Sequence, residues 1–150
     1  MNAIFVDSSV WIDHFRGVMT PGVRALQALL VALNPDTGED EPTQIFMGDL
    51  VLLEVLRGIL DDRQHERTRR ILLAFPQVEL AGTATALAAV DHSRALRRQG
   101  ITVRKAVDCL IAAWCIARSV PLLHNDRDFL PFATHCGLRE FSAAVAPSDR

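Results

Sequence analysis

The apolar pattern of the chain is densest in residues 106–117, where Asp108 is the only polar residue. The apolar side chains recur at the i, i+3, i+4, i+7 spacing of an α-helix, as in Val107, Leu110, Ile111 and Trp114. A helix that is apolar nearly all round is buried on most sides. Pro121 lies just beyond this pattern. The helix must end before it, because proline cannot continue a helix. We therefore predict a buried helix that carries one carboxylate near its start.

Short apolar runs elsewhere predict buried strands at residues 3–6, 45–47, 78–80 and 120–123, with a last edge strand at 137–141. Helical patterns and their caps fall between these runs, in residues 8–17, 21–33, 49–60, 61–75 and 83–99. In the helix over 83–99 we expect Leu87, Val90, Ala95 and Leu96 to face inward. Residues 34–43 form an acidic loop, expected to be the least ordered segment, and 142–150 a tail. This alternation predicts an α/β sandwich with a mostly parallel sheet.

Acidic residues occupy equivalent places in this pattern. Asp7 and Asp126 follow apolar strands, whereas Glu54 and Asp108 stand early in apolar helices. A helix between parallel strands runs antiparallel to them, so its N-terminus lies over the carboxyl edge of the sheet, where open α/β sheets bind ligands. The acids can therefore converge.

Simpler interpretations exist for each acid. Asp108 can favour the positive end of the helix dipole, and Glu54 can be a solvated surface residue. Asp126 and Asp128 can form a capped turn, and Asp7 can be a cap, although Ser8 or Ser9 is also a good N-cap.

Composition narrows the possible functions. The 150 residues, 49% apolar and 23% charged, fit one soluble domain, and the net charge of −2 gives no general attraction for nucleic acid. Arginines at 63, 67, 69, 70, 94, 97 and 98 are most simply solvated faces, but they are also candidates for gripping a phosphate backbone. The odd number of cysteines, 3, predicts reduced thiols in a cytoplasmic protein. No run reaches membrane-spanning length, and no secretory leader is evident.

Converging carboxylates repel one another unless a cation lies between them. A site made only of oxygen ligands suits Mg²⁺ or Mn²⁺, which activate water for phosphodiester hydrolysis. Asp7, Asp108 and Asp126 would hold one ion, and Glu54 would hold a second ion or orient the water. The histidines show no spacing typical of a metal-free pair.

At these acids the chain resembles the PIN-domain ribonucleases, and most closely the VapC toxins of toxin–antitoxin pairs. The resemblance rests on four pieces in order, VDSSVWID (6–13), LEVLRG (53–58), DCLIAA (108–113) and PLLHNDRDF (121–129).

The resemblance implies a three-layer α/β/α PIN-like fold, with a mostly parallel sheet of four to five strands, over a single domain of residues 1–150. It implies an endoribonuclease dependent on Mg²⁺ or Mn²⁺, with Asp7, Glu54, Asp108 and Asp126 as its acidic core. It also implies a homodimer and a VapB-type antitoxin whose C-terminal segment covers the active cleft. For the dimer we expect an apolar helix surface that includes Val23, Leu26, Leu30, Ile59 and Leu60.

Two further sets of residues complete the expected site. Supporting roles fall to Ser8, Ser9, Asn125 and Asp128, and RNA contacts to Arg57, Arg104, Lys105 and Arg127. The alternative function is a non-catalytic PIN-like module that binds RNA or protein, but such modules usually lose some of the acids. Phosphatase chemistry through Asp7 would require a second aspartate at position 9, which is a serine.

Overall fold

The computed structural model describes residues 2–33 and 43–142. The strands are β1 (Asn2–Val6), β2 (Thr43–Gly48), β3 (Gln77–Val78) and β4 (Leu122–Leu123). The helices are α1 (Ser8–Phe15), α2 (Pro21–Ala32), α3 (Asp49–Arg57), α4 (Asp62–Leu73), α5 (Thr83–Arg98), α6 (Ala106–Arg118) and α7 (Leu130–His135), with a 3₁₀ turn, η2 (Arg127–Phe129). The expected loop at 34–43 lies outside the described residues except for Thr43, and the expected tail does so except for Ser142.

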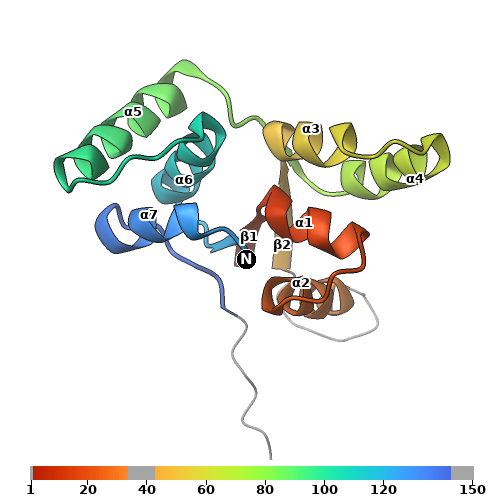
Figure 1. Ribbon diagram of the computed structural model, residues 1–150. Coiled ribbons are helices and arrows are strands. Elements are labelled where there is room, and N and C mark those ends of the chain that lie inside the picture. Colours follow the sequence, from red (N-terminus) through yellow and green to blue (C-terminus); the bar gives the residue numbers. More distant parts are fainter. Residues whose placement is uncertain (1, 34–42, 143–150) are drawn as a thin grey trace, which may run out of the picture.

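The four strands form one sheet in the order β3-β2-β1-β4, and every strand pair is parallel. Figure 1 shows α5, α6 and α7 on one side of the strands and α1 to α4 on the other. This arrangement confirms the expected three-layer α/β fold. Because all strands run the same way, their carboxyl ends share one edge of the sheet. The loops that leave this edge lead into α1, α3, α5 and η2.

The predicted strand at 137–141 is wrong in its extent. The structure has only an isolated parallel bridge between Leu122 and Glu140. The Leu122 amide donates to the Arg139 carbonyl oxygen (2.8 Å), and the Phe141 amide donates to the Leu122 carbonyl oxygen (2.9 Å). β4 is itself only two residues long, Leu122–Leu123, so it offers its neighbour little backbone to pair with.

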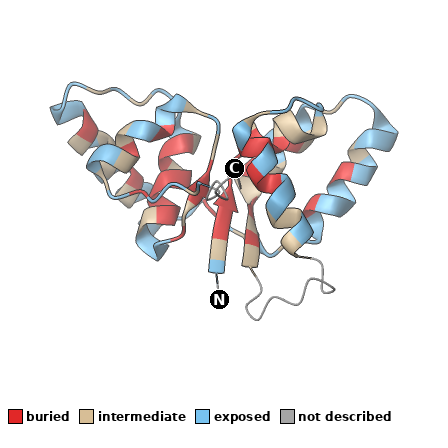
Figure 2. Cartoon of the chain, turned by 90° about the horizontal axis from the view of Figure 1, so that it is seen from below, coloured by how far each residue is buried: buried red, intermediate tan, exposed pale blue. Residues whose placement is uncertain are grey.

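The core lies between the sheet and its helices, as the buried residues in Figure 2 show. Phe5 in β1 and Ile111 in α6 are fully buried. The Trp114 ring on α6 contacts the rings of Phe5 (5.5 Å between centroids) and Phe46 (5.7 Å), on β1 and β2. The apolar pattern of residues 106–117 thus gives the helix that covers the centre of the sheet. Among the described residues, no helix combines the length and hydropathy needed to cross a membrane.

Two predicted apolar faces are only partly right. On α5, Leu96 is buried as expected, but Leu87 is 61% exposed and Val90 52% exposed, and Ala89 is buried instead. α5 packs against α6, and small side chains such as Ala89 allow two helices to approach closely, so the larger residues turn outward. On α2, Val23 and Leu26 are buried in the core, so they cannot belong to a dimer surface. Leu60, by contrast, is 95% exposed.

Gly48 ends β2 at a close approach of the chain to the core. A Cβ at this position would lie 2.6 Å from Leu80 Cδ1 and 2.8 Å from Phe5 Cζ. At Gly82 an added Cβ would meet no atom within 4 Å. We therefore expect Gly48→Ala to lower the free energy of unfolding by about 1–3 kcal/mol through overpacking. Gly82→Ala should change it little, and urea unfolding of both variants checks the difference. Equal stabilities of the two variants would contradict this packing.

Candidate active site

Asp7 stands where β1 ends and α1 begins. It is the N-cap of α1, and its Oδ2 accepts hydrogen bonds from the Ser9 amide (3.0 Å) and the Ser9 hydroxyl (2.6 Å). Of the N-caps that the sequence left open, Asp7 is the one observed, and Ser8 and Ser9 both lie inside the helix. Asp7 is only 3% exposed. Burial raises the pKa of Asp7, although the bonds from Ser9 act in the opposite direction.

Asp108 lies in the first turn of α6 and is 6% exposed. Its Oδ2 atom is buried and has no hydrogen-bond partner in the described part of the chain. Burial raises the pKa of Asp108 to about 7, and the charges of Asp7 and Asp126 add to the shift. A buried carboxylate without a partner is costly. A favourable interaction with the helix dipole, worth about 0.3–1 kcal/mol, does not account for its place here.

The segment that follows β4 lies beside Asp108. Asp108, Asp126 and Asp128 each offer a carboxylate oxygen, and these oxygens lie within 4.8 Å of one another. Asp126 also caps η2, since its Oδ1 accepts from the Asp128 amide (2.9 Å). The convergence expected of Asp108 and Asp126 is therefore present. Asp128, expected only as a supporting residue, lies as close, and its spacing of two positions from Asp126 is the sequence signal for it.

Asp7 and Glu54, both expected in the acidic core, lie beside each other and outside this group of three carboxylates. The Ser8 hydroxyl donates to Glu54 Oε2 (3.2 Å), which connects α1 to α3. Burial and the charge of Asp7 raise the pKa of Glu54, whereas Ser8, Lys105 and Arg57 lower it. Glu54 is exposed, so it stands at the open side of the site.

Asn125 ties the end of β4 to α1 and α2. Its backbone N–H donates to Ser9 Oγ (3.1 Å). Its side-chain Nδ2 donates to Asp13 Oδ2 (3.2 Å) and Thr20 Oγ1 (2.8 Å). A Cβ on Gly22 would clash with the Asn125 side chain. Through Ser9 this network reaches Asp7, so the backbone beside Asp126 and the carboxylate of Asp7 are held in one frame.

His124 belongs to the support of this loop. Its Nδ1 accepts from the Asp126 amide (3.2 Å), so the proton is on Nε2, which lies 2.7 Å from Glu140 Oε1. The His124 ring also lies 5.0 Å from the Phe129 ring, between centroids. The histidine thereby links the Asp126 turn to the segment that bridges β4.

The basic residues expected to contact RNA lie around the acids in different ways. The Lys105 Nζ atom forms an ion pair with Asp126 Oδ2 (3.3 Å), and this contact raises the pKa of Lys105. Arg57 is close enough to Glu54 to lower its pKa. Arg104 and Arg127 are exposed. Of these four basic residues, Lys105 is thus the one that forms an ion pair with an acid of the site.

The donor set fits a hard divalent cation. All candidate ligand atoms are carboxylate oxygens, the type that Mg²⁺ and Mn²⁺ prefer. Asp108 supplies a buried oxygen that has no partner in the part of the chain that the structure describes, and burial, with the charges of Asp7 and Asp126, raises its pKa. A cation among these carboxylates would remove this cost.

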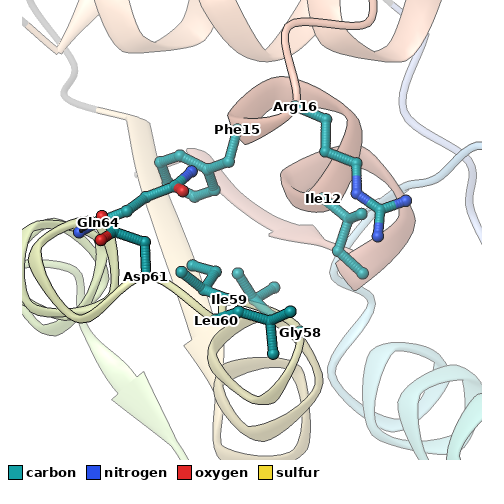
Figure 3. A pocket seen from close by; sticks show the side chains of 9 residues that line it. Ile12, Phe15, Arg16, Gly58, Ile59, Leu60, Asp61 and Gln64 are labelled. Atoms are coloured by element: carbon teal, nitrogen blue, oxygen red, sulfur yellow. Dashed lines mark hydrogen bonds between the residues drawn. The ribbon is translucent and has the colours of Figure 1, made fainter.

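An apolar hollow of about 400 Å³ lies against α1 and the connection from α3 to α4. Figure 3 shows the side chains of Phe15 from α1 and of Ile59 and Leu60 around it. Arg16 and Asp61 are the charged residues that line it, so its charges balance.

Fold and site together define an α/β protein with a candidate divalent-cation site at the carboxyl edge of a parallel sheet. A sequence model described as the PIN domain matches residues 4–133. This chain belongs to the PIN domain family.

Two curated relatives of this chain are the VapC ribonuclease Mb1587 of Mycobacterium bovis and the ribonuclease VapC11 of Mycobacterium tuberculosis. Each is 32% identical over 126 residues, which cover 84% of this chain and 88% of the relative. Among solved structures, VapBC2 from Rickettsia felis bound to a promoter DNA fragment has a TM-score of 0.68 at 16% identity, covering 95% of this chain and 99% of that chain. DNA-bound VapBC from Salmonella typhimurium has a TM-score of 0.66 at 15% identity, covering 94% and 98%. These structures support the fold.

The buried carboxylate of Asp108 should lower the stability of the metal-free protein, and this effect can be measured. In EDTA at pH 8, Asp108→Asn should melt about 2–4 °C above wild type, because it relieves repulsion worth roughly 1 kcal/mol. It should also gain less from added Mg²⁺, since stabilisation by a ligand follows its affinity for the folded state. Thermal melts with EDTA and with Mg²⁺ check both effects. Asp91→Asn, at an exposed position in the middle of α5, serves as the control.

The sign of the pH dependence follows from the raised pKa. Between the ordinary value of 3.8 and about 7, folded Asp108 binds a proton more tightly than the unfolded chain does. The metal-free wild type should therefore lose stability as the pH rises through this window, and Asp108→Asn should lose less. A lower melting temperature of Asp108→Asn in EDTA, with an unchanged Mg²⁺ shift, would contradict the assignment of Asp108 as a ligand.

Proposed function

We propose that this chain, as a single PIN domain over residues 1–150, is a Mg²⁺- or Mn²⁺-dependent endoribonuclease and the toxin of a cytoplasmic toxin–antitoxin pair. The observation that carries the proposal is the buried Oδ2 atom of Asp108, which has no hydrogen-bond partner among the described residues and lies at the sheet edge that Asp7 and Asp126 share. The family and the relatives that are ribonucleases by name support RNA as the substrate.

Asp108 and Asp126, whose carboxylate oxygens converge with one of Asp128, would hold the metal ion. Asp7, whose charge acts on Asp108, would complete the ligand set, with Glu54 at the open side. When bound, the ion supplies Lewis acidity and lowers the pKa of a coordinated water. Asp7 is kept in place by the two hydrogen bonds from Ser9. Glu54, held by Ser8, is positioned to orient the attacking water or to accept its proton. In-line attack on phosphorus breaks the P–O3′ bond and leaves a 5′-phosphate and a 3′-hydroxyl.

Basic residues around the acids contribute to RNA binding. Arg57 lies next to Glu54, and Arg104 and Arg127 are exposed. Lys105 balances the charge of Asp126. Because the whole chain has a net charge of −2, attraction for the phosphate backbone depends on such local cations.

The proposed protein partners are a VapB-type antitoxin and a second copy of the chain. Solved structures that share the fold are VapBC complexes, which supports the antitoxin. The charge-balanced apolar hollow beside α1 suits apolar side chains of the segment that covers the active cleft. For the homodimer, the exposed Leu87 and Val90 of α5 offer an apolar helix face in place of the buried α2 residues.

Cleavage of single-stranded RNA by the purified chain should require Mg²⁺ or Mn²⁺ and stop in excess EDTA. Asp7→Asn should lower the rate at least about a hundredfold, since the ion is worth several kcal/mol in the transition state. Asp91→Asn, which removes an exposed carboxylate from α5, is the matched control and should retain activity. The measurement is the cleavage rate of a labelled RNA. Full cleavage in EDTA would rule out this mechanism.

Expression of the chain without an antitoxin should arrest bacterial growth, because RNA cleavage would continue unchecked. Asp7→Asn should relieve the arrest at equal protein abundance, as should co-expression of an antitoxin encoded beside the gene. Growth curves with immunoblots test this. An Asp7→Asn protein that stays equally toxic would show that the arrest does not come from metal-dependent cleavage.

A further inference from the structure

A second hollow, of about 550 Å³, lies between α3 and α4. Residues at helical spacing line it from both sides. On α4 these are His65, Arg69 and Leu73, at i, i+4 and i+8, and on α3 they include Leu53 and Arg57, at i and i+4. Leu53 and Leu73 are exposed apolar residues. The hollow therefore combines an open apolar surface with two guanidinium groups.

The charge of this hollow is positive. Arg57 and Arg69 are always protonated, and among the described residues of the lining Asp49 is the one acid. The Asp49 Oδ1 atom already accepts hydrogen bonds from the Leu50 amide (2.8 Å) and the Leu80 amide (3.0 Å). In the described residues, no ion pair engages Arg57 or Arg69. The hollow therefore complements an anion, in contrast to the charge-balanced hollow beside α1.

The hollow adjoins the candidate active site through α3. Arg57 follows Glu54 by three positions, so both side chains leave the same side of the helix one turn apart. Arg57 lowers the pKa of Glu54, as expected for a cation nearby. A chain of phosphates that passes the carboxylates can therefore continue along α3 toward Arg69.

We infer that the α3–α4 hollow is a subsite for a nucleotide next to the scissile one in single-stranded RNA. Its base lies on Leu53, Leu73 and the His65 ring, and its phosphate contacts Arg57 and Arg69. An unpaired base is required, because only a single strand can turn a base face onto such a surface. This inference rests on the proposed ribonuclease function. It assigns the α3–α4 hollow as the path along which the RNA strand leaves the active site.

The test compares two arginines of α4. Arg69 lines the hollow, whereas Arg67, two positions away, is exposed and does not line it. With Mg²⁺ and a labelled single-stranded RNA, Arg69→Ala should raise KM about tenfold and leave kcat unchanged, whereas Arg67→Ala should resemble wild type. The plot of log(kcat/KM) against log[salt] should also become shallower by about 0.7 for Arg69→Ala, as expected for one lost phosphate contact to a single strand.

A second pair of variants tests the base contact. Leu73→Ser should raise KM without changing the salt slope, and Leu130→Ser, at an exposed apolar position on α7, should not. Equal KM values for Arg69→Ala and Arg67→Ala would overturn the inference. So would an unchanged KM together with an altered sedimentation mass or antitoxin affinity for Arg69→Ala, because the hollow would then be a protein contact.

The inference and the proposed function fail in different ways. If wild type cleaves RNA but the two arginine variants behave alike, only the subsite is wrong. If wild type cleaves no RNA under any metal condition, the proposed function is wrong. Fluorescence anisotropy of a labelled RNA oligomer with the full-length Arg69→Ala and Arg67→Ala proteins then decides whether the hollow binds RNA, and equal affinities would exclude it.

Discussion

Two like-charged carboxylates, Asp7 and Asp108, are buried at the carboxyl edge of one parallel sheet. The surrounding structure is arranged around the free-energy cost of burying them. Asp7 is partly compensated, because it caps α1 and accepts two hydrogen bonds from Ser9. The Oδ2 atom of Asp108 has no such compensation from any described residue. A fold selected for stability alone would place an apolar residue or an amide there. The uncompensated oxygen is therefore a physical argument for a bound cation that does not depend on any relative.

Local sequence signals predicted most of this architecture. α6 follows from an apolar pattern that contains a single acid, and its observed range, Ala106–Arg118, lies within a residue of the pattern. The chirality and packing of helices on parallel strands then place strand ends and helix starts at one edge. For this reason the proximity of Asp108 and Asp126 could be predicted, although they are far apart in the sequence. The four-residue run at 3–6 likewise sufficed to identify β1.

Long-range packing decided the features that sequence patterns did not reveal. On α5, Leu96 is buried as its spacing predicted, but Leu87 and Val90 are exposed and Ala89 is buried in their place, and no local signal distinguishes these positions. The link from His124 to Glu140 joins segments whose pairing depends on how the chain returns to β4. The position of Asp7 as cap depends on where the first helical turn starts, a boundary that two following serines made ambiguous.

α3 separates two surfaces of different chemistry. One side, with Val55 and the connection through Leu60, lines a hollow whose charges balance, and the other side, with Leu53 and Arg57, lines a hollow with net positive charge. Glu54 lies between them in the sequence and contacts α1 through Ser8. A protein partner and an RNA strand prefer different electrostatic surroundings. If each takes the hollow that matches its chemistry, both approach the same carboxylates from opposite sides of one helix. Inhibition by a protein would then require only that it cover the carboxylates, and the basic hollow would stay accessible to RNA.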